Sequence, residues 1–314
     1  MMNYEKKATR EAYGEALAEL GDKYDFLVLD ADLAAATKTG VFKKKFPERF
    51  FDCGIAEGNM ISVAAGIAAT GKCVFASSFA MFAAGRAFEQ VRNSVGYPHL
   101  PVKIGATHAG ITVGEDGATH QCLEDIAIMR TIPGMTIINP ADAVEARAAV
   151  EAAINFNGPV YMRFGRYATP VFNIGADYKF ELGKGVKLID GKDVTIVASG
   201  LTVSMAMEAA EMLSDEGISA RVINIHTIKP IDSEIIIAAA NETGAIVTAE
   251  EHNIIGGLGS AVAEVVCEEA PVPVIRVGIN DTFGRSGTVP ALLEAYGLTP
   301  KAIAEKAKKA ISMK

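Results

Sequence analysis

The sequence of 314 residues is poor in the features that small secreted proteins depend on. It contains no tryptophan and only four cysteines, Cys53, Cys73, Cys122 and Cys267, which are spread along the chain without a CxxC pair. Its amino terminus, MMNYEKKATREAYGE, is charged and has no apolar segment of the kind found in signal peptides. These absences disfavour a disulfide framework, and we expect a reducing, cytoplasmic location.

The chain also lacks a long hydrophobic run and an excess of positive charge. Its most apolar stretch, residues 73–85, lies between Lys72 and Arg86 and is shorter than the roughly 18 residues that a membrane-spanning helix needs. The 30 Lys and Arg residues are outnumbered by 38 Asp and Glu residues, which gives a formal net charge of −8. Because nucleic-acid binders normally carry a basic surface, we expect neither a membrane protein nor a general nucleic-acid binder.

What the chain does have is the composition and periodicity of a folded α/β protein. Hydrophobic residues make up 50% of the chain and charged residues 22%, and the length suffices for two domains. Segments rich in Val, Ile and Phe alternate with Ala- and Glu-rich segments at helical spacing, which is typical of parallel sheets covered by helices. In the first half, strands are predicted at 26–29, 73–76, 102–105, 136–138 and 160–164, and helices at 8–20, after residue 57, from residue 79, up to residue 130 and at 141–154.

The periodicity fails between residues 166 and 192, where Gly, Asp, Tyr and Pro accumulate, and then resumes. The second half predicts strands at 194–198, 220–225, 245–248 and 274–277, and helices at 203–213, 233–240 and 258–268, followed by two more helices. Because right-handed βαβ connections bury a sheet on both faces, we expect two doubly wound α/β domains. We place them at residues 1–170 and 193–314, joined by a linker at 171–192.

A polar loop, HAGITVGEDGATHQ at residues 108–121, follows the strand predicted at 102–105. It holds two histidines, His108 and His120, and two carboxylates, Glu115 and Asp116, among small residues. Ligands bind α/β sheets at loops that follow the carboxyl ends of strands, so we expect this loop to be functional rather than only a solvated connection. A zinc site is disfavoured because the two histidines lie twelve residues apart with no third ligand at metal-binding spacing.

Three further sets of residues are candidates for chemistry. Glu57, in CGIAEGNM, lies between small residues just before an apolar helix, where it either complements the helix dipole or exchanges a proton with a ligand. Phe79 and Phe82 lie three residues apart on one face of the predicted helix, a spacing more typical of a core than of a cofactor platform. Arg163 and Arg166 could be surface charges, but the guanidinium of Arg166, at a strand end, is also suited to gripping an anion.

Five strings in this chain together resemble the C-terminal half of transketolase: GIAEGNM, SSFAMF, THAGITVGEDGATHQ, EEHNIIGGLG and GINDTFGRSG. They occur in the family's order and spacing over nearly the whole chain, and the loop with GEDGxTHQ is the most specific of them. The resemblance implies that the first domain is a thiamine diphosphate pyrimidine-binding domain with a parallel sheet. The second would be the smaller transketolase C-terminal-like α/β domain, whose role is poorly defined.

One family motif is absent from this chain. Transketolases hold the diphosphate and its Mg²⁺ with a GDG motif and a later Asn in a preceding domain, and no GDG occurs here. The resemblance therefore implies a separately encoded C-terminal subunit of a split transketolase, without metal ligands of its own, that needs an N-terminal partner subunit bearing GDG and Asn. It also implies thiamine diphosphate and Mg²⁺ as cofactors and a heterotetramer. The expected reaction, transfer of a two-carbon ketol unit from a ketose phosphate to an aldose phosphate, belongs to the pentose phosphate pathway.

The resemblance assigns cofactor-binding roles by position. Glu57 corresponds to the carboxyl that hydrogen-bonds the aminopyrimidine ring and drives its amino-to-imino tautomerisation, which is a catalytic role. Phe82 corresponds to the ring that stacks on the pyrimidine, and Phe79 lines the same pocket. Asp32, in LDADLAAA, corresponds to an Asp near the cofactor.

Substrate-binding roles follow from the same resemblance. His120 corresponds to a catalytic residue near the reacting hydroxyl and carbonyl oxygens, where a neutral imidazole can donate or accept a proton near pH 7. Asp116 corresponds to the group that binds a hydroxyl of the donor sugar. Arg10, His108 and Arg166 correspond to residues that hold the sugar phosphate, a dianion for which guanidinium groups are suited.

Two departures from the family leave the substrate open: Ala36 replaces a Ser that helps hold the substrate phosphate, and Gly85 stands where Tyr is frequent. Three alternative functions are a deoxyxylulose-phosphate synthase-like subunit, a 2-oxo-acid dehydrogenase beta-type subunit, and a non-catalytic regulatory subunit. The GEDG ahead of THQ favours transketolase over the first two. The presence of Glu57, Asp116 and His120 argues against the third.

Overall fold

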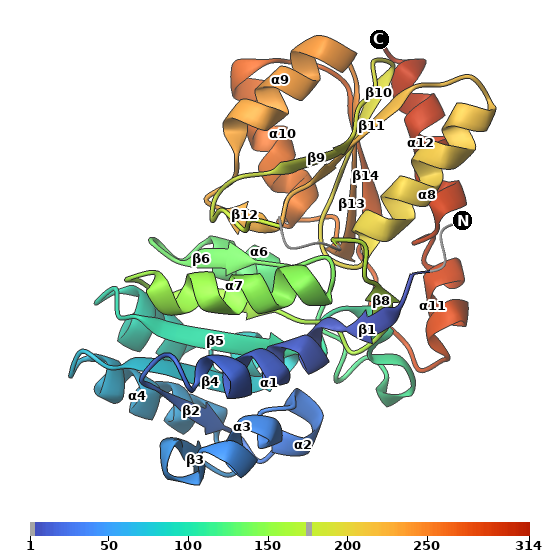
Figure 1. Cartoon of the computed structure of the whole chain (residues 1–314). Coiled ribbons are helices and arrows are strands. Elements are labelled where there is room, and N and C mark those ends of the chain that lie inside the picture. The colour runs from blue at the N-terminus through green and yellow to red at the C-terminus, as the bar shows by residue number, and fades with distance from the viewer. Residues whose placement is uncertain (1–3, 174–177) are drawn as a thin grey trace.

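The computed structural model describes residues 4–173 and 178–314, which form two α/β domains stacked one above the other (Figure 1). Residues 1–3 of the predicted first domain and 174–177 of the predicted linker lie outside this part. The first domain has a seven-stranded sheet of order β12-β6-β7-β5-β4-β2-β3, and the second has a five-stranded sheet of order β14-β13-β10-β11-β9. Both sheets are parallel except for the edge strands β12 and β9, so the predicted fold class is confirmed.

Helices cover both faces of the first sheet. The strands are β2 (Phe26–Asp30), β3 (Phe50–Asp52), β4 (Cys73–Phe79), β5 (Val102–Thr107), β6 (Thr136–Ile138), β7 (Val160–Arg163) and β12 (Thr227–Lys229). One apolar cluster packs α1 (Thr9–Leu20), α3 (Gly40–Lys45) and α7 (Ala143–Asn155) against one face. Another packs α4 (Glu57–Ala68) and α6 (Asp125–Arg130) against the other. The short elements of this domain are β1 (Lys6–Ala8), α2 (Ala34–Thr37), η1 (Pro47–Arg49), η2 (Met81–Arg86), α5 (Phe88–Gln90), η3 (Val91–Gly96), η4 (Ile111–Asp116) and β8 (Ala168–Pro170).

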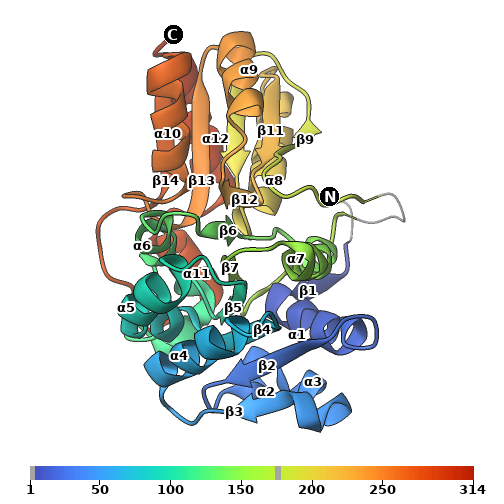
Figure 2. The ribbon, with the colours of Figure 1, turned by 90° about the vertical axis from the view of Figure 1, so that its left-hand side faces the viewer.

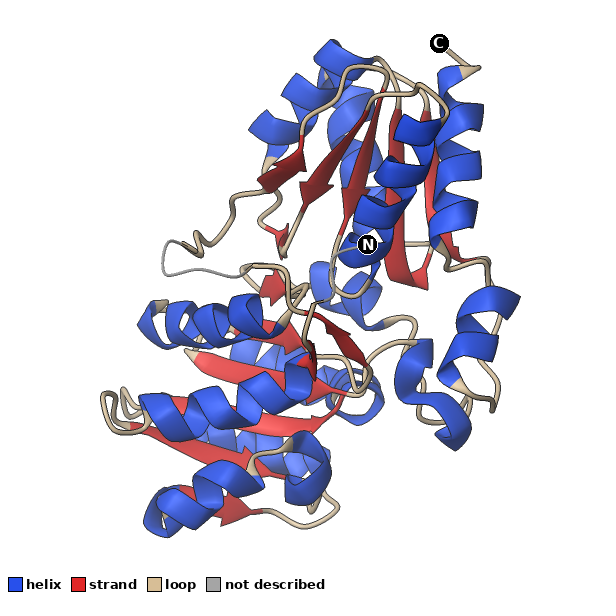
Figure 3. Ribbon diagram, turned by 45° about the vertical axis from the view of Figure 1, so that its right-hand side comes forward, coloured by secondary structure: helices blue, strands red, loops and turns tan. Residues whose placement is uncertain are grey.

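The second domain repeats this layering around its own sheet (Figures 2 and 3). Its strands are β9 (Val186–Ile189), β10 (Val194–Ala198), β11 (Ala220–Asn224), β13 (Ile246–Asn253) and β14 (Val274–Ile279). An apolar cluster joins one face to α8 (Thr202–Asp215), α11 (Val289–Ala295) and α12 (Pro300–Ile311), while α9 (Ser233–Thr243) and α10 (Leu258–Glu269) cover the other. Within the described ranges, no helix combines the length and the apolar character needed to cross a membrane.

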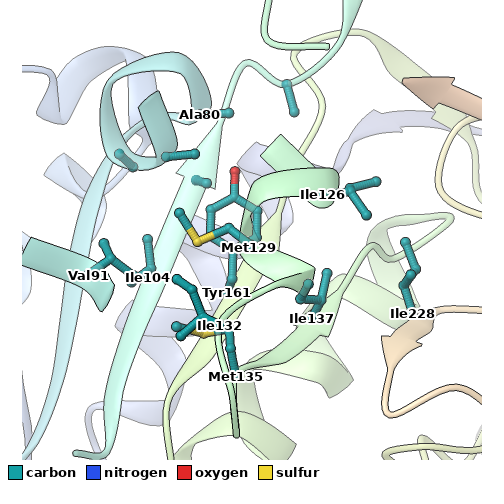
Figure 4. Packing of buried hydrophobic residues seen from close by; sticks show 14 of the residues in the cluster. Ala80, Val91, Ile104, Ile126, Met129, Ile132, Met135, Ile137, Tyr161 and Ile228 are labelled. Carbon is teal, nitrogen blue, oxygen red and sulfur yellow. The ribbon is translucent and has the colours of Figure 1, made fainter. Parts of the chain in front are cut away.

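One apolar cluster continues from the first domain into the second. It includes Ile126 and Met129 of α6, Ile137 of β6 and Ile228 of β12. Figure 4 shows Met129 beside the ring of Tyr161 on β7, with Ile228 lying on the side of Ile137. Because β12 comes from the second half of the sequence yet pairs with β6 of the first sheet, the two domains share a core.

The predicted strands and long helices are present, with ends that differ by a few residues, but the helix predicted from Phe79 is wrong at its start. Strand β4 continues to Phe79, because Ser77, Ser78 and Phe79 pair in register with the last three residues of β5. The chain then forms η2, which has wide π-helical turns. Phe79 and Phe82 therefore do not share one helical face.

The predicted linker also differs from the structure, because it contains the edge strand β9. This strand is half-exposed and pairs antiparallel with β11 through an irregular register. Four partly exposed residues at a sheet edge show too little alternation to be separated from a loop by pattern.

Buried His226 is expected to make the stability of the chain depend on pH. Burial lowers the pKa of its imidazole to about 4 from the ordinary 6.5. The unfolded chain therefore takes up a proton as the pH falls below 6.5, while the folded chain does not until about pH 4. As the pH falls from 6.5 to about 4, protonation of His226 in the unfolded chain should lower the free energy of unfolding by roughly 2 to 3 kcal/mol. Urea unfolding at several pH values should show a flatter pH dependence for His226→Asn, and parallel curves for the two proteins would contradict this account.

Candidate active site

The parallel strand order brings the predicted site residues to one edge of the first sheet. Strands β7, β5, β4 and β2 are neighbours, so their carboxyl ends lie side by side. Phe79 is the last residue of β4, His108 directly follows β5, and Arg166 follows β7. Asp32 follows β2, and Glu57 follows β3 as the first residue of α4. Doubly wound sheets bind ligands at this edge, which is formed by the carboxyl ends of the strands.

Four rings form a continuous aromatic group at this edge. The imidazole of His108 stacks on Phe79 with ring centroids 3.8 Å apart, and the rings of Phe79 and Phe82 are 5.9 Å apart and nearly parallel. His120 meets both phenyl rings edge-on, at 6.3 Å and 5.5 Å. The structure therefore joins residues of β4, η2 and the loop at 108–121, and flat apolar faces of this kind suit a planar ring.

His108 is neutral and holds Arg10 in place. Burial lowers the pKa of His108 to about 3, and the charges of Arg10 and Arg166 add to this shift. Its Nε2 lies 3.0 Å from Nη1 of Arg10, and its Nδ1 lies 3.0 Å from the hydroxyl oxygen of Thr107. Because a guanidinium only donates, Nε2 accepts and the ring proton resides on Nδ1. Arg10 also donates to the backbone oxygen of Ala36 at 2.9 Å, so the position that lacks the family's Ser still orients this cation.

Glu57 is almost fully buried, with 1% of its surface exposed, and is paired with a residue that we did not predict. Nη1 of Arg86 lies 2.9 Å and 3.1 Å from the two carboxylate oxygens of Glu57. The guanidinium of Arg86 also lies over the ring of Phe82, 4.6 Å from its centroid. Arg86 follows Phe82 by four residues in a helical segment, the spacing that places a cation over a ring, and this signal could have identified it.

Arg166 and Asp116, predicted to bind substrate, are paired with each other. Nη1 of Arg166 lies 3.2 Å from Oδ2 of Asp116 and also donates to the backbone oxygen of Val113. Both side chains are more than one-third exposed, at 37% and 43%. Exposed ion pairs contribute little to stability, so either partner can exchange the other for a ligand at small cost.

Asp32 is the predicted site residue that the structure leaves apart. It is exposed, its φ is +60°, and its backbone N–H donates to Asp52. In the part of the chain that the structure describes, no hydrogen bond, ion pair or ring contact links its side chain to the aromatic group. The buried carboxylate of this segment is Asp30, which accepts hydrogen bonds from the hydroxyls of Thr37 and Thr39.

The arrangement has two chemically different ends. At one end, the buried carboxyl of Glu57, linked to the face of Phe82 through the guanidinium of Arg86, can exchange a proton with a ring nitrogen. At the other, Arg10 and Arg166 are close enough for the charge of Arg166 to lower the pKa of Arg10, after the larger effect of burial. Such a pair of cations suits an anionic group. No group of three or more His, Cys, Asp or Glu residues that could hold a metal ion occurs within residues 4–173 and 178–314.

Comparison with known proteins matches both domains. The family model for the transketolase pyrimidine binding domain matches residues 5–171, and that for the transketolase C-terminal domain matches residues 183–303. A solved structure described as "Split gene transketolase, inactive beta4 tetramer" is 54% identical and superimposes with a TM-score of 0.90 over 98% of this chain and 99% of that chain.

Curated relatives agree with this result. A Methanocaldococcus jannaschii protein, provisionally named a transketolase C-terminal section, is 53% identical over 96% of this chain and 95% of its own length. The 6-deoxy-6-sulfo-D-fructose transketolase subunit SqwH of a Clostridium species is 47% identical over 95% of this chain and 92% of its own length. Human transketolase is 38% identical over 96% of this chain, which spans 48% of that protein. The resemblance found in the sequence is thus confirmed: this chain belongs to the transketolase family and corresponds to the C-terminal section of its longer members.

Proposed function

We propose that this chain is the C-terminal subunit of a two-chain transketolase that transfers a two-carbon ketol unit from a ketose phosphate to an aldose phosphate. The observation that carries this proposal is the buried carboxyl of Glu57, whose partner Arg86 lies over the face of Phe82. The diphosphate of thiamine diphosphate and its Mg²⁺ would be held by the GDG motif and Asn of an N-terminal partner subunit. When bound, the cofactor supplies the nucleophilic carbon that carries the two-carbon unit.

The residues at the end of the site that holds Glu57 fit an aminopyrimidine ring. Arg86 makes both contacts that such a ring needs, a flat contact on Phe82 and hydrogen bonds to Glu57. Its side chain is 54% exposed and free to swing towards solvent when the ring replaces it. Glu57, Phe82, Phe79 and, less directly, Asp32 would then hold the pyrimidine. Glu57 would share a proton with the ring nitrogen.

The remaining site residues would act on the sugar. His120, edge-on to both phenyl rings, would pass a proton to and from the reacting hydroxyl and carbonyl oxygens. Asp116 would leave Arg166 and accept a hydrogen bond from a hydroxyl of the donor. Arg10 and Arg166 would bind the anionic end of the sugar, with neutral His108 orienting Arg10.

The donor sugar is expected to carry an anionic group that faces Arg10 and Arg166. Two relatives carry substrate names: one is a 6-deoxy-6-sulfo-D-fructose transketolase subunit, and the other is an apulose-4-phosphate transketolase subunit, 41% identical to this chain. Both names describe sugars with an anionic substituent. The cations Arg10 and Arg166 suit either anion, and we propose a phosphorylated ketose of the pentose phosphate pathway as the donor.

Replacing Arg10 by glutamine is expected to raise the KM for a phosphorylated donor about ten- to a hundredfold, because a charged hydrogen bond to the phosphate is lost. For an uncharged donor such as erythrulose, KM should change little. Steady-state kinetics of the two-chain enzyme with both donors measures the difference. An equal rise in KM for the two donors would show that Arg10 does not bind the anion.

Exposed apolar side chains in the segment around Glu57 support assembly with other chains. Three large apolar side chains within six residues of Glu57 in the sequence are exposed: Phe51 at 48%, Ile55 at 76% and Val63 at 42%. Exposed apolar groups beside a site are typical of protein interfaces. We propose that these residues help to form a heterotetramer of two such chains and two N-terminal subunits, in the cytoplasm.

Calorimetric titration of thiamine diphosphate with Mg²⁺ tests the proposal before any activity is measured. Binding is expected for an equimolar mixture of this chain with a GDG-bearing N-terminal subunit, because the two ends of the cofactor are held by different chains. Each chain alone should bind the cofactor at least about 100-fold more weakly. Tight, Mg²⁺-dependent binding by this chain alone would contradict the proposed division of the site.

A further inference from the structure

The loop at 108–121, which carries His108, Asp116 and His120, is attached to the second domain along its length. The backbone N–H of Thr112 donates to Oε1 of Glu251 at 2.7 Å. The hydroxyl of Ser286 donates to the backbone oxygen of Glu115 at 2.7 Å, and Nε2 of Gln121 donates to the backbone oxygen of Arg285 at 2.9 Å. Helix α11, which follows this part of the second domain, extends down beside the first domain (Figure 1). The second domain thus contacts the loop near its start, middle and end.

The carboxyl of Glu251 is built closely against the loop. Glu251 lies on β13 and is 4% exposed, and burial raises its pKa. Gly110 has a φ of +79°, and a Cβ atom there would lie 2.2 Å from the carboxyl carbon of Glu251. A side chain at Gly110 would therefore both strain the backbone and displace Glu251. The loop conformation and the position of this carboxyl depend on each other.

A buried arginine, Arg163, holds the backbone of Glu251, on the second-domain side of this contact. Arg163, considered above as a possible surface charge, is 3% exposed. Its Nε donates to Oδ2 of Asp125 at 2.8 Å, and one Nη donates to the backbone oxygens of Glu251 at 2.8 Å and Cys122 at 3.4 Å. Tyr161 donates to the same oxygen of Asp125. One guanidinium therefore joins β7, α6, the residue after Gln121, and β13.

Loops of this length are ordinarily among the least stable parts of a domain. Here Thr112 and Glu251, which meet across the domain boundary, are both buried, and a buried group that loses its partner is costly. Opening the contact between Thr112 and Glu251 would leave a buried carboxyl without its donor. The second domain therefore restrains the segment that carries three of the proposed sugar-binding groups.

We propose that Glu251 is a positioning residue: through the backbone of Thr112, the C-terminal domain holds the loop at 108–121 in the geometry that the sugar requires. Its effect on catalysis rests on the function proposed above, whereas its effect on the loop does not. This inference gives the second domain a defined role in the site, although it contributes no residue to the aromatic group.

Hydrogen exchange of the full chain measures the restraint without any activity. Glu251→Ala is expected to speed amide exchange at residues 110–117 about tenfold or more, because the acceptor of the Thr112 N–H is removed. Glu251→Gln should restore most of the protection, since its amide oxygen can still accept. Glu250→Ala is the matched control: Glu250 is also buried on the same strand, but it accepts from the backbone of Leu258 and Gly259 at the start of α10. It should loosen α10 and leave the loop unchanged.

Unchanged loop exchange in folded Glu251→Ala, or equal acceleration in Glu250→Ala, would overturn the inference. If Glu251→Ala does not fold, Gly110→Ala tests the contact from the loop side and should also speed exchange at residues 110–117. In the two-chain enzyme, Glu251→Ala should raise the donor KM about tenfold and leave cofactor affinity near the wild-type value, because Glu57 and Phe82 lie outside the loop. If wild-type enzyme shows no transfer, the proposed function fails while the exchange experiment still decides the positioning role.

Discussion

Glu57→Gln is expected to remove ketol transfer almost completely, lowering kcat of the two-chain enzyme by about 10³-fold. Glutamine keeps the size and hydrogen-bonding reach of Glu57 but cannot share a proton with a ring nitrogen. With 1% of Glu57 exposed, water has little access to take over this role. Cofactor affinity should fall much less than kcat, because the face of Phe82 remains. Steady-state kinetics combined with calorimetric titration separates the two effects.

Glu48→Gln is a suitable control for this change. Glu48 is exposed and lies in η1, just before the amino end of β3 and therefore away from the carboxyl edge of the sheet. Its replacement should leave both turnover and cofactor affinity unchanged. Wild-type turnover in Glu57→Gln would show that the buried carboxyl is not the proton donor, and the proposed mechanism would fail.

The second large effect is expected at His120. Replacing it by alanine should lower kcat by about 10²-fold, the usual contribution of one general acid–base group. Its imidazole lies at the edge of both phenyl rings, and its Nδ1 contacts the hydroxyl of Thr119 at 3.0 Å. Cofactor affinity should stay close to that of the wild type, since His120 makes no contact with Glu57. Single-turnover kinetics with excess enzyme would locate the loss in the chemical step.

His99→Asn provides the comparison for a histidine outside the site. His99 is exposed and has a φ of +55°, a conformation that Asn tolerates. The variant should transfer at the wild-type rate. A loss in His99→Asn as large as that in His120→Ala would mean that removing a histidine harms the protein in general, and would contradict a specific role for His120.

The sequence predicted the parts of the fold whose signals are local and strong. Strand β2 opens with four consecutive apolar residues, Phe26 to Leu29, and is largely buried, so its apolar run identifies it without a partner. By contrast, β12 has three residues, and its identity as a strand comes from pairing with β6, which lies far away in the sequence. A segment this short carries no periodicity of its own, so sequence pattern could not place it.

The same distinction applies to the site. Glu57, His108 and His120 are marked in the sequence by unusual surroundings of small residues and, through family resemblance, by motif. The pairing of Glu57 with Arg86 spans 29 residues, and that of Thr112 with Glu251 spans 139. Contacts of this kind arise only when α4 meets η2 or the second domain meets the first. For that reason, the positioning role of the second domain became visible only in the structure.

The central claim is that two different chains share one active site. The most direct measurement is two-carbon transfer from xylulose 5-phosphate to ribose 5-phosphate by this chain alone, by a GDG- and Asn-bearing N-terminal subunit alone, and by both together. Thiamine diphosphate and Mg²⁺ are supplied and withheld in turn. The account predicts transfer only with both chains and both cofactors. Transfer by this chain alone, or none from a stable, cofactor-loaded pair with phosphorylated or sulfonated donors, would contradict it.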